Sequence, residues 1–295
     1  MDNKWSQFVQ TTEELYRSRA LRFHKVNKDL WLSALQVEDG MNVLEIGCGG
    51  GVFCHRIKEY LPNTIVTGLD FDSGHIEYAK ARTIELGLDC KFINGDARNL
   101  PFADNTFDLC FSYTVAEHIS TEKFLSEQHR VLKPNGKIVI LSVRTRMGLS
   151  ENNDSSVSEE EKRLFEKAWS KAGDYDKNNG IGAYELKERD FPVILEKAGF
   201  KNIGIDFFTV SSYCPDNART PYEAAIEQIE VNRMLTLTSI KKALRIAPDG
   251  LTDSERLSLV EMINRRYNKR IEQYKKGEKL WDFTVNTTLT ASGRK

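Results

Sequence analysis

An acidic residue and four glycines fall within the seven residues from Glu45 to Gly51, in the pattern E-x-G-x-G-x-G. The apolar residues just before the turn predict a strand over 42–46, and the segment 52–60 predicts a helix. A glycine turn between a strand and a helix lets the backbone come close to a ligand. The spacing therefore predicts a ligand-binding turn with a carboxylate at its start.

A dinucleotide is the first ligand to consider for such a turn, because G-x-G-x-x-G cradles a pyrophosphate in dinucleotide-binding folds. Here the third glycine position of that pattern is held by Val52, so the match fails. The carboxylate of Glu45 would also repel a pyrophosphate, whereas it suits a ligand with positive charge. The turn therefore favours a cationic ligand.

Two further acids follow predicted strands downstream of this turn. Asp70 ends the second strand, 25 residues after Glu45, where a carboxylate can accept hydrogen bonds from both hydroxyls of a ribose. Asp96 follows the third strand and could accept from an adenine amino group, with the backbone N–H of Ala97 meeting a ring nitrogen. The carboxyl ends of these strands thus carry donors and acceptors suited to a nucleoside.

Strand and helix patterns alternate along the first half of the chain. Strands are expected at 42–46, 64–69, 90–94, 107–112 and 137–143, with helices at 52–60, 73–86 and 121–132. The turn residues Pro134, Asn135 and Gly136 should close the last helix. This spacing favours a doubly wound α/β fold with a mostly parallel sheet. Two late strands, 202–211 and 281–291, would complete seven strands.

The chain divides into six expected segments, which begin with an N-terminal helical cap over 1–40. They continue with a ligand-binding core over 41–145, an insertion over 146–185, a core continuation over 186–211, a helical insertion over 212–280 and a final core strand over 281–295. The cap has helical spacing over 13–35. The insertions contain helical patterns at 160–172, 221–247 and 252–276, and the core continuation has one at 188–199.

Composition narrows the classes of function. With 295 residues and a net charge of −1, the chain has no general attraction to nucleic acid or to a membrane surface. No stretch approaches the roughly 18 apolar residues of a membrane span. The five scattered cysteines form no C-x-x-C pair and predict neither a disulfide framework nor a zinc site. We therefore expect a cytoplasmic protein without a metal; an oligomer is possible but not indicated.

Read in order, the motifs EIGCGGG, GLD, NGDARNLPF, FD, EHI and RVLKPNG resemble those of class I S-adenosylmethionine-dependent methyltransferases. The resemblance covers roughly residues 43–143 and lies closest to the small-molecule branch that includes ubiquinone-type methyltransferases. It implies a Rossmann-like fold, S-adenosylmethionine as methyl donor and S-adenosylhomocysteine as product. It also implies that the insertions at 146–185 and 212–280 fold over the cofactor as lids.

The resemblance further implies a set of cofactor contacts: Glu45, Gly47, Cys48, Gly49, Asp70, Phe71, Asp96, Ala97 and Ser112. In this set the first two glycines line the methionine part of the cofactor and Glu45 faces its ammonium group. Asp70 holds the ribose, Phe71 stacks on the adenine, and Ser112 lies near the methionine. For Cys48, a small residue that fills space is favoured over a reactive thiol.

Methyl transfer needs a nucleophile in line with the methyl–sulfur bond, and it needs a base where the acceptor arrives protonated. His118 is the candidate base, because it follows the fourth strand at the ligand-binding edge and its ordinary pKa is about 6.5. The alternative is that His118 only packs within its loop. Three residues are candidates for substrate or lid contacts: Tyr16, Arg22 and Tyr113.

The basic residues of the first helix, Arg17, Arg19 and Arg22, are placed to reach the methionine carboxylate or else form a solvated face. The basic run at 265–276 contains acids as well and favours a solvated helix face.

The best-supported function is methyl transfer to an oxygen, nitrogen or carbon atom of a small molecule. A nucleic-acid or protein methyltransferase is the first alternative, but residues 112–115 read Ser-Tyr-Thr-Val where amino-methylating enzymes of that kind carry Asn/Asp-Pro-Pro-aromatic. The second alternative is a non-catalytic protein that binds S-adenosylmethionine.

Overall fold

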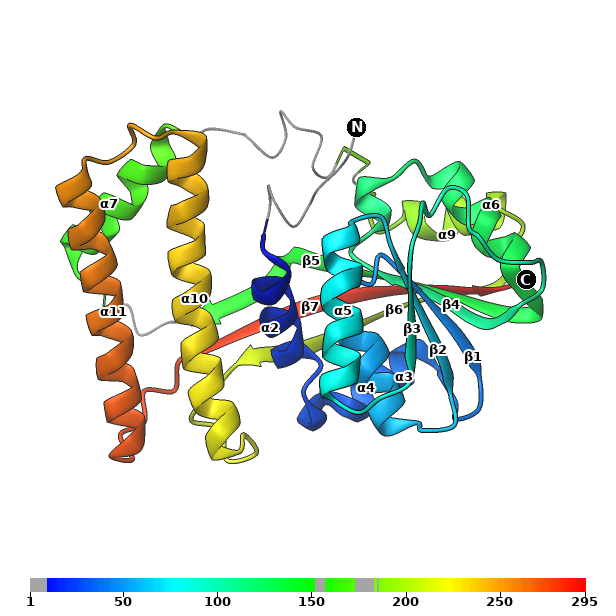
Figure 1. Ribbon diagram of the computed structural model, residues 1–295, viewed down its shortest axis with the longest axis horizontal. Helices are drawn as coiled ribbons and strands as arrows, with labels where there is room; N and C mark the ends of the chain where they lie inside the picture. The colour runs from blue at the N-terminus through cyan, green and yellow to red at the C-terminus, as the bar shows by residue number, and fades with distance from the viewer. Residues whose placement is uncertain (1–9, 152–156, 173–182, 185) are drawn as a thin grey trace. The chain divides into compact units, whose positions relative to one another are not determined.

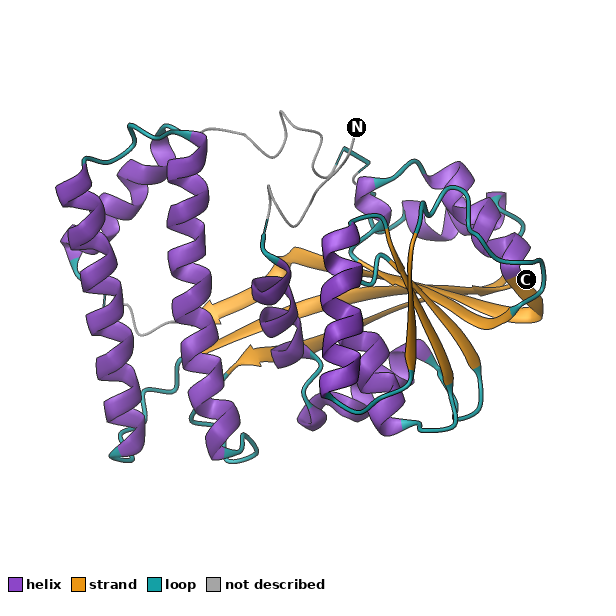
Figure 2. Ribbon diagram, viewed as in Figure 1, coloured by secondary structure: helices purple, strands orange, loops and turns teal. Residues whose placement is uncertain are grey.

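The computed structural model describes residues 10–151, 157–172, 183–184 and 186–295. Seven strands form one sheet in the order β3-β2-β1-β4-β5-β7-β6 (Figure 2). Their bounds are β1 Asn42–Ile46, β2 Ile65–Asp70, β3 Cys90–Asn94, β4 Phe107–Tyr113, β5 Leu132–Glu151, β6 Lys201–Tyr213 and β7 Phe283–Arg294. The pairs β1/β2, β2/β3, β1/β4 and β4/β5 are parallel. The structure confirms the doubly wound α/β fold.

Helices cover both faces of this sheet (Figure 1). One face packs on α3 Lys28–Leu35, α4 Val52–Tyr60 and α5 Ser73–Glu85, and the other on α6 Thr121–Val131 and α9 Asp190–Lys197. Neighbouring residues of β1 point to opposite faces: Val43 joins the first core, and Leu44 joins the second. The central strands are apolar on both sides because both faces are buried.

The N-terminal region differs from the single helix expected over 13–35. The structure has α2 Thr12–Arg22, the 3-10 turn η1 Lys25–Asn27 and then α3. The carbonyl of Arg22 accepts hydrogen bonds from the Asn27 amide at 3.0 Å and from Trp31 Nε1 at 2.8 Å. These side-chain bonds take the place of intrahelical bonds, so α2 ends there and the chain turns.

Strand β5 is longer than the expected 137–143 and begins directly after α6. Phe107 pairs with Leu132, and the next partners are Leu109 and Lys137, so the residues between Leu132 and Lys137 form a bulge. Asn135 has a φ of 63° within this bulge. The residues expected to form a turn at 134–136 therefore loop out of a strand that continues on either side.

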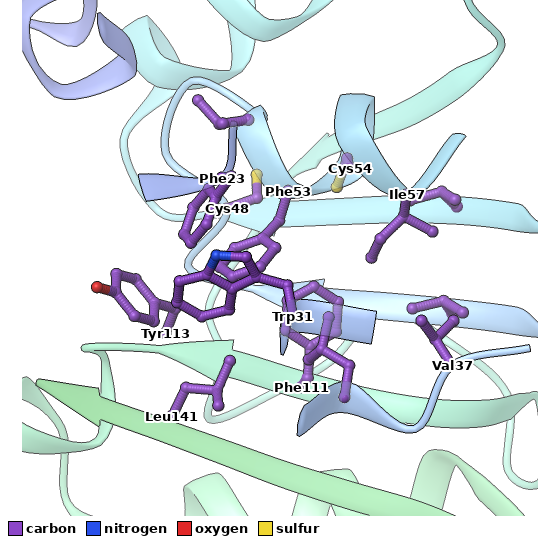
Figure 3. Packing of buried hydrophobic residues seen from close by; sticks show 14 of the residues in the cluster. Phe23, Trp31, Val37, Cys48, Phe53, Cys54, Ile57, Phe111, Tyr113 and Leu141 are labelled. Atoms are coloured by element: carbon purple, nitrogen blue, oxygen red, sulfur yellow. The ribbon is translucent and has the colours of Figure 1, made fainter. Parts of the chain in front are cut away.

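A cluster of aromatic rings fixes the end of β4 (Figure 3). The ring centroids of Phe23 and Trp31 lie 4.5 Å apart, and those of Trp31 and Tyr113 lie 5.8 Å apart, both edge to face. Phe53 of α4 packs within 5.6 Å of Tyr113. The hydroxyl of Tyr113 points away from these rings in Figure 3. Its ring is thus held in the core, while its polar end faces the C-terminal edge of the sheet.

The described residues cluster into two compact units. The first contains residues up to 147, those from 183 to 210 and those from 286 onward, with β1 to β4 and the helices on both faces. The second contains residues 148–172 and 211–285, with the helices α7 Glu159–Ser170, α10 Tyr222–Ile246 and α11 Asp253–Lys275. These three helices share an apolar core that includes Leu164, Ile229 and Ile263. The role of this unit as a lid stays a prediction.

Two arginines of α11 depart from the expected solvated face. Arg266 pairs with Glu161 of α7 at 2.8 Å. Arg270 is 5% exposed and pairs with Asp216 and Asp282, each at 2.8 Å. The charge run is therefore divided: Arg265 pairs with Glu261 in solvent, whereas Arg266 and Arg270 hold the second unit together from inside.

No helix in the described part of the chain is long and apolar enough to cross a membrane. Among those same residues, no group of three or more His, Cys, Asp or Glu side chains is gathered as a metal site requires.

Replacing Arg270 with Met should destabilise the second unit by about 3–5 kcal/mol, because two buried carboxylates would lose their cation. Urea denaturation followed by circular dichroism measures this change. Arg265→Met is the matched control: its ion pair with Glu261 is 75% and 70% exposed, so the expected loss is below about 0.5 kcal/mol. Equal losses in the two variants would contradict the structural role of Arg270.

Candidate cofactor-binding site

The glycine turn joins the end of β1 to the start of α4 and follows the conformation that glycine permits. Gly47, Gly49 and Gly51 have φ values of 71°, 53° and 84°. A side chain at Gly47 would overlap Val115, and one at Gly51 would come within 2.6 Å of Phe92. The turn is therefore restricted to glycine by backbone conformation and by close packing. The turn lies at the sheet edge where ligands bind in such folds; Gly47 is half-buried there, and the rest of the turn is buried.

Cys48, the fourth residue of the E-x-G-x-G pattern, packs inside the turn. Its side chain is 7% exposed, and burial raises the pKa of its thiol well above the ordinary value. A buried neutral thiol is a poor nucleophile. Cys48 therefore fills space in the turn.

Glu45 lies at the end of β1 and is 3% exposed. Its Oε2 accepts hydrogen bonds from the backbone N–H of Cys54 at 3.2 Å and from the Cys54 thiol at 3.0 Å. Burial raises the pKa of Glu45 to about 8, against the opposing effect of these hydrogen bonds. The carboxyl thus caps the first turn of α4. A role toward the ammonium group of a cofactor stays a prediction.

Asp70 ends β2 and binds two backbone segments at once. Its Oδ2 accepts from the N–H of Gly49 at 2.8 Å, and its Oδ1 accepts from the N–H of Asp72 at 2.9 Å. Each carboxylate oxygen retains a second lone pair for another donor. The side chain is 13% exposed, with His75 Nδ1 at 3.5 Å. Asp70 therefore sets the shape of the turn and still has acceptors to offer a ligand.

The expected adenine contacts lie after β2 and β3. Phe71 follows Asp70 and is 47% exposed, so the face of its ring is open to a ligand. Asp96 forms a two-pronged ion pair with Arg98, at 3.0 Å from Nε to Oδ1 and 2.7 Å from Nη2 to Oδ2. The pair lowers the pKa of Asp96. Ala97, which lies between Asp96 and Arg98 in the sequence, is half-buried. Asp96 must therefore share its carboxylate between Arg98 and any adenine amino group.

The C-terminal end of β4 carries a buried hydroxyl and a sharp change of direction. Ser112 is fully buried, and its Oγ makes no hydrogen bond within the described residues. Thr114 has a φ of 54°, a rare conformation for a β-branched residue. It leads the chain into η2 Ala116–His118. Burial, with a smaller effect of the Arg19 charge, lowers the pKa of His118 below its ordinary value. His118 is therefore neutral at pH 7.

Helix α2 packs over the glycine turn. Leu15 and Tyr16 come within 3.0 Å and 3.2 Å of the positions that Cβ atoms at Gly49 and Gly50 would take. Tyr16 is 8% exposed, and its hydroxyl lies 3.3 Å from His55 Nδ1. The structure therefore places Tyr16 in the core, and its contact with a substrate or lid stays a prediction.

Arg22 does reach the sheet edge, because its Nη1 donates to the Tyr113 hydroxyl at 2.9 Å. The structure thus brings Arg22 and Tyr113 together, while their contact with a substrate or lid stays a prediction. Arg98 and Thr114 had no role in the sequence-based expectations. For Arg98 the sequence does contain a signal, because its charge is opposite to that of Asp96 two residues earlier. Nothing in the sequence marks Thr114.

Residues 44–140 match the model of a methyltransferase domain. This segment runs from β1 into β5 and includes the glycine turn, Asp70, Asp96 and His118. This segment is therefore similar to the domains of known methyltransferases. The matched segment therefore includes the edge of the sheet at which the sequence motifs converge.

Two curated relatives support this assignment. The chain is 37% identical over 123 residues to a demethylmenaquinone methyltransferase of Staphylococcus epidermidis, covering 40% of this chain and 49% of the relative. It is 39% identical over 127 residues to the norajmaline N-methyltransferase of Rauvolfia serpentina, covering 42% of each. The chain therefore spans about half the length of the curated relatives it matches.

Among solved structures, the chain is similar to phosphoethanolamine N-methyltransferase 2 of Haemonchus contortus, which was determined in complex with S-adenosyl-L-methionine. The TM-score is 0.54 at 17% identity, with 99% of this chain and 60% of that chain covered. At this identity the likeness establishes the fold alone.

Glu45→Gln should change how the stability of the cofactor-free protein depends on pH. The folded pKa of about 8 lies above the ordinary value of 4.5, so the stabilising effect of the protonated carboxyl is complete below pH 4.5 and is lost as the pH rises to 8. Between pH 5 and pH 8 the wild type should lose about 3–4 kcal/mol more unfolding free energy than Glu45→Gln. Urea denaturation at several pH values measures this, and parallel curves would contradict the burial of an ionisable Glu45.

Proposed function

We propose that this protein transfers a methyl group from S-adenosylmethionine to a small-molecule acceptor. The observation that carries the proposal is the convergence of the glycine turn, Asp70 and the end of β4 on one edge of a methyltransferase domain. Both relatives named above are methyltransferases with small-molecule substrates in their names, one a quinone and one an alkaloid. Since the match covers less than half of each relative, the acceptor of this chain is part of the proposal.

The residues at this edge fit the adenosine part of the cofactor. The two oxygens of Asp70 are held at fixed positions by Gly49 and Asp72 and have lone pairs for the two ribose hydroxyls. The exposed ring of Phe71 offers a stacking surface for adenine. Asp96 and the N–H of Ala97 would contact the adenine edge, with Arg98 holding the Asp96 carboxylate in place.

Groups of opposite charge fit the amino-acid end of the cofactor. The buried Glu45 lies beside the turn and can take a negative charge when an ammonium group approaches it. The Arg19 guanidinium is close enough to Glu45 for their charges to interact. A carboxyl and a guanidinium in this arrangement complement a zwitterion. The buried hydroxyl of Ser112 would supply a further hydrogen bond near the methionine.

The bound cofactor supplies an electrophilic methyl group on a sulfonium. The protein has to orient the acceptor, exclude water and accept a proton from acceptors that carry one on the attacking atom. His118 lies in η2, directly after β4, and its lowered pKa keeps the imidazole neutral and able to accept a proton. We propose His118 as the general base.

Asp70→Ala should weaken the binding of S-adenosylhomocysteine at least tenfold, because it removes the ribose acceptor and both hydrogen bonds that hold the turn. Isothermal titration calorimetry measures the dissociation constant, which we expect to be micromolar for the wild type. Asp206→Ala, at an exposed position of β6, is the charge-matched control. Equal affinity of Asp70→Ala and wild type would reject the assignment of Asp70.

His118→Ala should lower turnover about 10²–10⁴-fold and leave the affinity for the methyl donor unchanged, as expected for loss of a general base. The acceptor for this assay comes from a screen in which methyl-labelled S-adenosylmethionine is incubated with the protein and a cell extract. In the wild type, kcat/KM should fall as the pH drops through the pKa of His118, which lies below 6.5. If kcat/KM of His118→Ala still falls at low pH as in the wild type, another group is responsible for that pH dependence.

A further inference from the structure

Two arginines of α2 reach the end of β4 without an acidic partner. Arg19 Nη2 donates to Thr114 Oγ1 at 3.1 Å, and Arg22 Nη1 donates to the Tyr113 hydroxyl at 2.9 Å. Neither guanidinium lies within ion-pair distance of a carboxylate among the residues that the structure describes. No N–H group of Arg19 or Arg22 is both buried and without a hydrogen-bond partner. Each arginine thus has hydrogen-bond donors left for a ligand.

The helix dipole does not by itself explain this placement. Cations are favoured in the last turn of a helix, and Arg19 and Arg22 meet that preference. Both side chains, however, turn to the sheet edge, where the guanidinium of Arg19 lies 4.5 Å from the centre of the Tyr113 ring. Burial and the neighbouring charge of Arg22 lower the pKa of Arg19 to about 10. Two like charges held together here are unfavourable until an anion arrives.

Glu45 does not balance these charges in the empty protein, because its raised pKa leaves it mostly protonated at pH 7. The methyl donor brings one carboxylate, which Arg19 is placed to take. It also brings an ammonium and a sulfonium, so the loaded site gains no net negative charge. The second guanidinium, that of Arg22, stays unpaired after the donor binds.

We propose that the methyl acceptor carries an oxyanion, a carboxylate or a phosphate, which binds to Arg22 beside Tyr113. This inference rests on the proposed function and names its substrate class. The Tyr113 oxygen accepts from Arg22, so its own O–H is left to donate to the same anion. A guanidinium and a phenol that converge in this way form charge-assisted hydrogen bonds with carboxylates and phosphates. The aromatic cluster of Figure 3 holds the phenol rigidly for this purpose.

The test uses inorganic phosphate as probe and the full chain saturated with S-adenosylhomocysteine. Phosphate binding is followed by broadening of the ³¹P resonance, with chloride keeping the ionic strength constant and acetate as competitor. The wild type should bind phosphate, and Arg22→Met should bind it about tenfold more weakly, as expected for one charge-assisted hydrogen bond. Arg22→Lys should recover part of the loss, because it keeps the charge but not the planar fork. Arg56→Met, which removes a partly exposed cation of α4 that pairs with Glu59, should bind like the wild type.

Two results would overturn the inference. One is equal phosphate affinity in Arg22→Met and Arg56→Met, which would mean non-specific attraction. The other is phosphate binding to the protein saturated with 5′-methylthioadenosine, which lacks the amino-acid end, but not to the protein saturated with S-adenosylhomocysteine; the carboxylate of the donor would then occupy Arg22. Equal binding of 5′-methylthioadenosine by all variants shows that the adenosine site is intact. A wild type that does not bind S-adenosylhomocysteine would instead reject the proposed function itself.

Discussion

The carboxylate of Asp70 accepts hydrogen bonds from two backbone segments, at Gly49 in the glycine turn and at Asp72 before α5. The bond from Gly49 connects the C-terminal ends of β1 and β2, which pair in parallel, and the bond from Asp72 shapes the loop after β2. The turn can then keep the positive φ values of Gly47 and Gly49, which no other residue adopts easily. Of the expected cofactor contacts, Gly49 is held directly by Asp70, and Phe71 follows Asp70 in the chain.

Most of the core fold follows from the sequence because its signals are local. The helix over 52–60 and the strands over 42–46 and 90–94 have the expected bounds, since glycines, a proline or a change of periodicity mark their ends. Two regions did not follow. The break after Arg22 depends on hydrogen bonds from Asn27 and Trp31, and the bulge in β5 depends on pairing with β4. Both are tertiary effects that periodicity does not record.

The candidate site was predictable as a set of positions, but the environment of each residue was not. The sequence places Glu45 beside the turn, yet only the fold reveals that Cys54 donates to it and that burial raises its pKa. Likewise, the ion pair between Arg98 and Asp96 depends on the conformation of its loop. The contacts of Arg19 and Arg22 with Tyr113 depend on how α2 packs against the end of β4. The basic run of α11 was misjudged because the acids that pair with Arg266 and Arg270 come from distant segments.

Electron density for S-adenosylhomocysteine in crystals of this protein tests the central claim most directly. The account predicts that both ribose hydroxyls lie within hydrogen-bond distance of the Asp70 carboxylate and that the adenine stacks on Phe71. It also predicts that the homocysteine part lies over Gly47 and Gly49. Density at the same edge of the sheet with the ribose turned away from Asp70, or binding elsewhere on the protein, would contradict the account.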